Sequence, residues 1–277
     1  MDTCNILDNA LLKLKPCVET EKANQKENFS ALVIGDGCTD EFIYGKCERL
    51  APEGPVPIFI PVNRVVNGGM ARNVDRNFHS FGIKTCLITN EQEILKTRYV
   101  DEHTNHTIIR VDRGDKVVSM SFIDLVLVES LIQDYNAVVV SDYNKGFLTT
   151  ESIKQIGKRC SECGIVSFID TKKPIQDEWI SDYSFIKINY VERQSVNDVS
   201  KETLNKMIVT LGKNGAEYQG ERYPVEEVEV KDLSGAGDTF LAALVCNYLK
   251  SRNVSDAIRF ANKMSSIVVQ KRGVSTV

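Results

Sequence analysis

The sequence predicts an α/β fold in which helices cover both faces of a mostly parallel sheet. Three observations support this prediction. Short apolar runs that are typical of buried strands alternate with longer stretches of helical periodicity. Several of these runs end in Asp, Asn or Gly, as strands do when they open onto a ligand crevice. Residues 42–66 interrupt the alternation with prolines and short β-like runs, which indicates a small excursion from the main sheet.

The elements follow in order along the chain. A short amphipathic helix over residues 5–15 and a polar linker over 19–28 precede the first strand. The predicted strands are 31–37, 85–89, 137–142, 165–170, 185–189 and 207–212, and a second β-like patch covers 97–112. The predicted helices are 70–81, 121–134, 149–163, 237–251 and 254–270. We therefore expect an N-terminal extension over residues 1–30 and one domain over 31–277.

The composition is that of an ordinary globular protein with a sizeable core. Of the 277 residues, 42% are hydrophobic and 26% are charged, and the formal net charge is −4. This balance gives no bulk reason to expect a nucleic acid or an anionic membrane as partner. No apolar run approaches the roughly 20 residues that span a bilayer, and the N-terminus lacks the basic-then-apolar order of a signal peptide. We expect a cytoplasmic protein.

The stretch VKDLSGAGDTFLAALV, residues 230–245, predicts a tight loop that enters a helix. Gly235, Ala236 and Gly237 have little or no side chain, so the N–H groups at the helix N-terminus can receive a phosphate. Asp238 would repel that phosphate, but it can take a proton from a hydroxyl beside it, as phosphoryl transfer requires. Asp238 can equally be only a helix cap. The residues alone leave both interpretations open.

A second stretch, NGGMARN at 67–73, predicts a diglycine turn that enters a helix. Gly68 and Gly69 can expose backbone amides to a sugar, and Asn73 can both donate and accept hydrogen bonds. An ordinary turn followed by a capped helix explains the pattern as well. The chain has no P-loop, and GDGCTD at 35–40 lacks the third glycine of a dinucleotide-binding fingerprint.

Together, NGGMARN and DLSGAGDTF resemble the two signatures of the ribokinase-like (PfkB) carbohydrate kinases, and NYVE at 189–192 matches the Asn-x-x-Glu motif of that family. Three stretches resemble one branch, the heptose 7-phosphate kinases of the lipopolysaccharide-core pathway: ERLAPEGPVPIF, VVVSDYNKGFL and ANKMSSIVVQKRGVSTV. The resemblance implies a ribokinase-like three-layer α/β/α sandwich with a β lid over 42–66 and 97–112. It ends where the kinase part of the bifunctional heptose enzymes ends, so we expect no nucleotidyltransferase activity.

The resemblance also implies roles at matching positions. Asp238 would be the base, and Gly235, Ala236 and Gly237 would form the anion hole for the γ-phosphoryl group of ATP. Asn189 and Glu192 would order Mg²⁺ and its water beside the phosphates. The residues implied to line the sugar site are Asp36, Asp40, Asn67, Gly68, Gly69 and Asn73. Those implied on the nucleotide side are Thr210, Gly212, Gly215 and Asn262.

Basic residues near the lid are candidates for binding an anionic substrate. Lys145 follows the predicted strand that ends at Asp142, so it can reach the crevice and bind a substrate phosphate; the alternative is a solvated surface lysine. Arg98 and Arg110 lie in β-like segments, where either substrate contact or lid structure accounts for them. In the family the lid covers the sugar, excludes water and often pairs with a second subunit, so we expect a homodimer.

The expected function is an ATP- and Mg²⁺-dependent sugar kinase, in its most specific form acting on the anomeric 1-hydroxyl of D-glycero-β-D-manno-heptose 7-phosphate. Two alternatives stay open: a kinase of the same fold with another sugar or sugar phosphate, and a shortened, non-catalytic sugar or nucleotide binder. The second alternative arises because the chain passes almost directly from 86–90 to 94–100, where the family has another helix and strand. DTKKP at 170–174 and KINYVE at 187–192 also depart from the family's usual forms.

Overall fold

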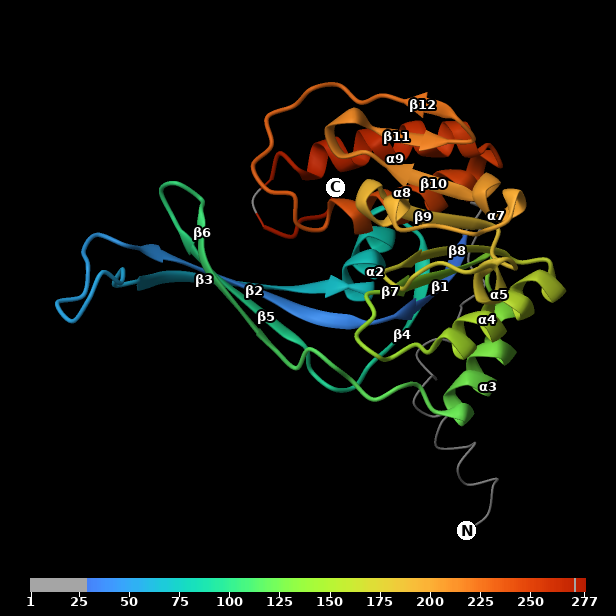
Figure 1. The fold of residues 1–277 in the computed structure, drawn as a ribbon, viewed down its shortest axis with the longest axis horizontal. Coiled ribbons are helices and arrows are strands. Elements are labelled where there is room, and N and C mark those ends of the chain that lie inside the picture. Colours follow the sequence, from blue (N-terminus) through green and yellow to red (C-terminus); the bar gives the residue numbers. More distant parts are fainter. Residues whose placement is uncertain (1–28, 272) are drawn as a thin grey trace, which may run out of the picture.

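The computed structural model describes residues 29–271 and 273–277, which form an eight-stranded main sheet and a four-stranded lid sheet (Figure 1). The strands of the main sheet are β1 (Ser30–Gly35), β4 (Lys84–Thr89), β7 (Ala137–Asp142), β8 (Val166–Thr171), β9 (Phe185–Asn189), β10 (Met207–Thr210), β11 (Ala216–Tyr218) and β12 (Glu221–Tyr223). Their order is β12-β11-β10-β9-β8-β7-β1-β4. The six strands from β10 to β4 in this order are parallel, and β11 and β12 add an antiparallel edge.

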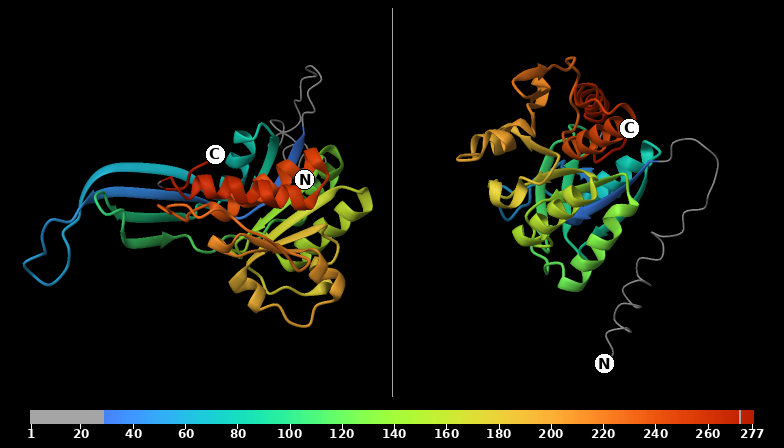
Figure 2. Two further views of the ribbon diagram at one scale, coloured as in Figure 1. Left: turned by 90° about the horizontal axis from the view of Figure 1, so that it is seen from above. Right: turned by 90° about the vertical axis from the view of Figure 1, so that its right-hand side faces the viewer.

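Helices cover both faces of the main sheet, which makes three layers (Figures 1 and 2). One face carries α2 (Ala71–Ser80), α8 (Ala236–Ser251) and α9 (Val254–Val268). The other face carries α3 (Phe122–Leu131), α4 (Thr150–Cys163) and α5 (Asp177–Ile180). Two further short helices, α6 (Tyr190–Gln194) and α7 (Lys201–Asn205), follow β9.

Each central strand contributes to two hydrophobic cores. Along β1, Val33 packs into the core under α2, α8 and α9, whereas Leu32 and Ile34 pack into the core under α3, α4 and α5. A strand that is buried on both faces exposes neither face to solvent. This explains why the sequences of the central strands are continuous apolar runs. The predicted α/β class with a mostly parallel sheet is confirmed.

The lid is a separate sheet that projects from the carboxyl edge of the main sheet (Figure 1). Its strands are β2 (Gly37–Lys46), β3 (Ile60–Met70), β5 (Leu95–Asp101) and β6 (Thr107–Arg113), in the order β3-β2-β5-β6. The segments 42–66 and 97–112, which the sequence places in a lid, lie in this sheet and its loops. Near the C-terminus, Val274 packs against Phe42 and Val100 on the lid.

The direct passage from main sheet to lid has a structural explanation. β4 is the edge strand, so the chain leaves the main sheet there and enters β5 after a short turn. Asn90 closes this crossing, because its side chain accepts from Gly37 N at 2.7 Å and donates to Gly37 O at 3.0 Å. The described chain therefore crosses from the main sheet to the lid without an intervening helix or strand.

Predicted and observed elements differ mainly in short segments. The predicted helix 121–134 consists of α3, capped by Ser121 and Asp124, and a 3₁₀ turn at 132–134. The β11–β12 hairpin and the helices α5, α6 and α7 were not predicted. The predicted helix 5–15 and linker 19–28 lie outside the described residues. Within the described part of the chain, no helix is both long and apolar enough to cross a membrane.

Candidate active site

Asp238 lies in the first turn of α8, buried at the carboxyl edge of the main sheet. Its Oδ1 accepts a hydrogen bond from the Tyr143 hydroxyl at 2.7 Å, and its Oδ2 accepts one from Asn73 Nδ2 at 2.9 Å. Burial raises the pKa of Asp238 from 3.8 to about 6, although both hydrogen bonds and the Lys187 ammonium act in the opposite direction. The group is therefore ionised at neutral pH and has a pKa close to the value that suits a general base.

Asp238 is not the cap of its helix. The N-cap of α8 is Gly235, which makes no side-chain capping bond and has a φ of 80°. A Cβ on Gly235 would lie 2.6 Å from Asn73 Nδ2, so only glycine fits both this backbone conformation and this contact. The interpretation of Asp238 as only a helix cap is therefore wrong.

The N-terminus of α8 also offers free hydrogen-bond donors. Ala236 N donates to Leu233 O and Thr239 N donates to Gly235 O, but the N–H groups of Gly237 and Asp238 have no partner among the described residues. Unpaired N–H groups at the start of a long helix attract anions. Gly235, Ala236 and Gly237 are thus arranged as an anion hole would be.

A chain of buried amides fixes α2 against α8. Asn77 Nδ2 donates to Asn73 O at 2.8 Å, and Thr239 Oγ1 donates to Asn77 Oδ1 at 3.0 Å. Both asparagines and the threonine are fully buried. This network holds Asn73 where its amide reaches Asp238 instead of facing solvent.

The loop after β7 supplies Tyr143, which the sequence analysis did not single out. Asp36 anchors this loop, because its carboxylate accepts from the backbone N–H groups of Tyr143 at 2.8 Å, Lys145 at 3.1 Å and Phe147 at 3.2 Å. Burial raises the pKa of Asp36, opposed by these hydrogen bonds. The resemblance implies that Asp36 lines the sugar site. In the structure, the hydrogen bonds of its carboxylate go to the backbone of this loop.

A cluster of lysines and carboxylates lies next to Gly237 at the N-terminus of α8. Lys187 Nζ is 3.1 Å from the position that a Cβ on Gly237 would occupy, and it pairs with Asp170 at 2.5 Å. Lys172 pairs with Glu192 at 2.5 Å and with Asp170 at 3.4 Å. Burial raises the pKa of Asp170, but the two lysines outweigh this and the pKa is lowered overall. The sequence pointed to Lys187 only through its unusual position, a charged residue inside the apolar run FIKIN.

Asn189 and Glu192 form a reciprocal capping box at the start of α6. Glu192 N donates to Asn189 Oδ1 at 2.9 Å, and Asn189 N donates to Glu192 Oε2 at 2.8 Å. The described residues contain no group of three or more His, Cys, Asp or Glu side chains that could hold a metal. A Mg²⁺ ion here would need ligands from nucleotide phosphates, which is the usual binding mode of this ion.

A cavity of about 690 Å³ lies beside the N-terminus of α8, along α8 and α9. All four residues implied on the nucleotide side, Thr210, Gly212, Gly215 and Asn262, line it together with Ala236 and Gly237. Asn262 Nδ2 donates to Tyr223 O at 2.8 Å. The cavity has the size of a small-molecule site, and its apolar lining suits a flat base: Val225, Val228, Val230, Leu233, Phe240 and Val269.

Most of the remaining predicted residues lie in the lid sheet, where Asn67, Gly69, Arg98 and Arg110 share the face of Asp40 and Gly68 lies on the opposite face. Lys145 lies outside the lid, in the loop after β7. Asp40 is opposite Asn67 across β2 and β3, and its Oδ2 lies 1.9 Å from where a Cβ on Gly69 would be. Arg98 pairs with Asp40 at 2.5 Å, and Arg110 makes two 2.6 Å hydrogen bonds to Asp112. A Cβ on Gly68 would meet Arg72, and Lys145 pairs with Asp115. Asn67 is half-buried at the base of β3.

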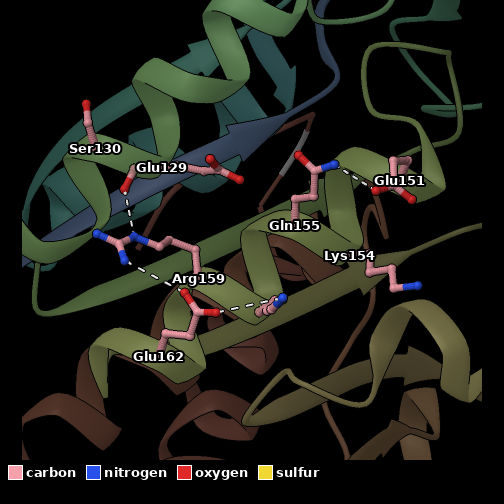
Figure 3. Close-up of a pocket in the computed structure, with 8 residues that line it drawn as sticks. Glu129, Ser130, Glu151, Lys154, Gln155, Arg159 and Glu162 are labelled. Carbon is pink, nitrogen blue, oxygen red and sulfur yellow. Dashed lines mark hydrogen bonds and ion pairs between the residues drawn. The ribbon is translucent and has the colours of Figure 1, made fainter.

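A separate depression between α3 and α4 contains none of these residues (Figure 3). Several of its polar side chains interact with one another or with the backbone: Arg159 reaches Glu129 O at 3.4 Å and Glu162 at 3.8 Å, and Gln155 donates to Glu151 at 2.7 Å. These groups satisfy each other, so we assign the depression no ligand.

We expect Tyr143→Phe to shift the pH dependence of kcat/KM. The Tyr143 hydroxyl lowers the pKa of Asp238 by donating to its charged form, so removing it should raise that pKa above about 6. The acidic limb of the profile should then move to higher pH. Tyr135→Phe, at the opposite end of β7, is the matched control and should leave the limb in place. An unshifted limb in Tyr143→Phe would show that the bond to Asp238 has no effect on the base.

Comparison with known proteins adds independent findings. The sequence profile of the pfkB family carbohydrate kinases matches residues 70–277. The bifunctional protein HldE of Sulfurimonas denitrificans is 32% identical over 89% of this chain, and that of Nitratiruptor sp. is 30% identical over 88%. The chain spans 62% of the length of each of these two relatives.

Solved structures with the same fold include two sugar kinases. Ribokinase of Arabidopsis thaliana, solved with ribose and ATP, has a TM-score of 0.63 and 17% identity, covering 89% of this chain and 94% of its own. Phosphofructokinase-2 of Escherichia coli, solved with potassium, has a TM-score of 0.66 and 14% identity, and the match covers 89% of this chain and 94% of that one. These similarities establish the ribokinase-like three-layer fold.

Proposed function

The chain belongs to the pfkB family of carbohydrate kinases, and we propose that it transfers the γ-phosphoryl group of ATP to the anomeric 1-hydroxyl of D-glycero-β-D-manno-heptose 7-phosphate, giving the 1,7-bisphosphate. The observation that carries the proposal is the position of Asp238. This buried carboxylate, with a pKa of about 6, adjoins the unpaired N–H groups of Gly237 and Asp238. A base beside an anion hole is the arrangement that phosphoryl transfer to a hydroxyl needs.

In the proposed reaction Asp238 accepts the proton of the sugar hydroxyl. Asn73 and Tyr143 hold the carboxylate in place through their hydrogen bonds. The free N–H groups at the start of α8 and the Lys187 ammonium stabilise the negative charge of the transferring group. The lid excludes water, which would otherwise compete with the sugar as acceptor.

The residues of the site fit ATP and Mg²⁺. The cavity beside α8 would hold the base of ATP between apolar side chains, with its phosphates at Ala236 and Gly237. Glu192 and Asn189 would hold Mg²⁺ through water, because the carboxylate oxygens already accept hydrogen bonds from Lys172 and Asn189. Mg²⁺ supplies positive charge that offsets the negative charge of the phosphates. Because the reaction consumes ATP, we place it in the cytoplasm.

Two features favour a phosphorylated heptose as acceptor. The stretches 48–59, 138–148 and 261–277 resemble the heptose 7-phosphate kinases. Basic side chains also gather on the Asp40 face of the lid and in the loop after β7, where Arg98, Arg110 and Lys145 lie. We propose that the sugar binds between this face and Asp238, with Asp40, Asn67 and the Gly68–Gly69 turn around its hydroxyls.

The proposal is tested by measuring ADP release from purified protein with Mg²⁺-ATP. D-glycero-D-manno-heptose 7-phosphate, fructose 6-phosphate, ribose and no sugar are run in parallel. Release that depends on the heptose phosphate is the expected result. Release with another sugar would keep the mechanism and replace the substrate. Binding of ATP without release for any sugar would identify the chain as a non-catalytic binder.

We further propose that two copies pair through the lid. The face opposite Asp40 exposes Val66 on the edge strand β3 and Ile109 and Val111 on the edge strand β6, with 47%, 54% and 38% of their surface exposed. Exposed apolar side chains on a sheet face are typical of an interface. Sedimentation velocity should give a dimer, and Ile109→Lys should shift it to monomer. A wild-type chain that sediments as a monomer would refute the pairing.

A further inference from the structure

Three basic residues share the face of the lid that carries Asp40, which we call the inner face. Lys96 and Arg98 alternate along β5, and Arg110 is opposite Arg98 on β6. Lys96 is opposite Asp40 on one side and Asp112 on the other. The register therefore places all three cations and both carboxylates on one surface.

The two arginines of the inner face already have carboxylate partners. Arg98 pairs with Asp40 at 2.5 Å, and Arg110 binds both oxygens of Asp112 at 2.6 Å. Lys145, in the loop after β7, pairs with Asp115. Lys96 differs from all of these, because its ammonium has no hydrogen-bond or ion-pair partner among the residues that the structure describes.

Lys96 is nevertheless almost completely buried. Only 8% of its surface is exposed. Its Nζ lies 5.6 Å from the centre of the Tyr143 ring, and the Tyr143 hydroxyl donates to Asp238. A buried cation that no carboxylate contacts directly is unfavourable unless an anion arrives to pair with it. The Lys96 ammonium is therefore available to pair with an anion that binds next to Tyr143.

We infer that Lys96 binds the non-reacting phosphate of a phosphorylated sugar and selects such sugars over neutral ones. The inference rests on the proposed function and assigns this part of the substrate to a residue that the sequence analysis did not name. A phosphate monoester supplies the missing counter-charge and several acceptor oxygens. A neutral sugar would leave the buried ammonium unpaired, so the same residue attracts one class of substrate and disfavours the other.

Lys96 is better suited to this role than Lys145. The charge of Lys145 is already balanced by Asp115, whose side chain is 61% exposed, so a phosphate competes with that ion pair for the ammonium. Lys96 gives up no ion pair. We therefore expect Lys96 to dominate the binding of the phosphate and Lys145 to contribute less.

The test compares KM and kcat of Lys96→Met for a phosphorylated sugar and for the same sugar without its phosphate. Methionine keeps the length and burial of the side chain and removes the charge. The pair is D-glycero-D-manno-heptose 7-phosphate and D-glycero-D-manno-heptose. We expect KM for the phosphorylated sugar to rise roughly 10- to 100-fold, as for the loss of a hydrogen bond to a charged group. KM for the neutral sugar should stay level or fall.

Three variants complete the design. Lys96→Arg should recover much of the affinity for the phosphorylated sugar, and Lys145→Met should raise KM less than Lys96→Met does. Lys116→Met removes an exposed lysine beside Asp115 and should change neither constant. Competitive inhibition of the wild type and of Lys96→Met by inorganic phosphate gives a readout that does not depend on the identity of the sugar, and it should weaken in the variant.

The outcomes separate this inference from the proposed function. If the wild type prefers fructose 6-phosphate to the heptose phosphate, the substrate is replaced and the KM comparison is made with fructose 6-phosphate and fructose. If Lys96→Met raises KM equally for both sugars of a pair, or lowers only kcat, the inference is overturned while the kinase activity stands. A wild type that uses neutral sugars alone overturns both the inference and the heptose phosphate assignment.

Discussion

Asp238→Asn should lower kcat by about 10²–10⁴-fold, the usual contribution of a positioned general base. The asparagine side chain fits the same site, since it can accept from Asn73 and donate to the Tyr143 oxygen. ATP binding should therefore change little, and the loss should appear in turnover. Measurement of ADP release with the true acceptor and of ATP affinity separates the two effects. Normal turnover by Asp238→Asn would exclude Asp238 as the base.

Stability provides the control for this variant. Burial raises the folded-state pKa of Asp238 from 3.8 to about 6, so the folded protein binds this proton more tightly than the unfolded chain does. The free energy of unfolding therefore falls as pH rises through this interval, and the ionised group costs stability above it. Asp238→Asn removes that cost. Its melting temperature at neutral pH should equal or exceed that of the wild type, which excludes misfolding as the reason for lost activity.

Lys187→Met should lower kcat by about 10²–10³-fold, comparable to the loss of one donor from an oxyanion hole. Lys187 Nζ lies beside Gly237, and its charge also lowers the pKa of Asp238. The variant should therefore show a second effect, an acidic limb of kcat/KM shifted to higher pH. It should also lose stability, by about 3–5 kcal/mol, because the buried Asp170 loses its nearer partner.

The double variant Lys187→Met/Asp170→Asn distinguishes catalysis from folding. Removing both charges of the buried pair should restore most of the free energy of unfolding, because no uncompensated carboxylate remains. Activity should stay low if Lys187 acts on the transferring phosphoryl group. A double variant that regains both stability and turnover would limit Lys187 to neutralising Asp170.

Local pattern was sufficient to predict the main elements. The alternation of apolar runs and helical periods located β1, β7, β8 and β9 because each of these strands is buried on both faces. The β11–β12 hairpin was missed because its strands are three residues long and carry no clear period. Helix α5 has only four residues and forms through the burial of Trp179 and Ile180, which no local rule anticipates.

The part of the candidate site that lies in one continuous motif was predictable from the sequence. The glycines of 235–237 and Asp238 are consecutive, so their role could be proposed from the sequence. Tyr143 and Lys187 could not be found in this way, because each acquires its role from a partner distant in the sequence. Lys96 is a similar case. It stands out because no carboxylate of the described residues contacts its ammonium, and the sequence does not reveal this. The ion pair of Arg98 with Asp40 depends on the register of β5 against β2, which is settled only when the lid is formed.

The hydrogen bonds that build the site also determine when it appears during folding. Asn73 and Asp238 are 165 positions apart in the sequence, and Asp36 and Phe147 are 111 apart. Loop closure over such distances is slow. These contacts add no stability until the strands between them are in place. A refolding chain should therefore regain its helical circular dichroism before it regains turnover. In partly folded chains the proposed base and anion hole are not yet assembled. Such chains therefore cannot hydrolyse ATP without phosphorylating a sugar.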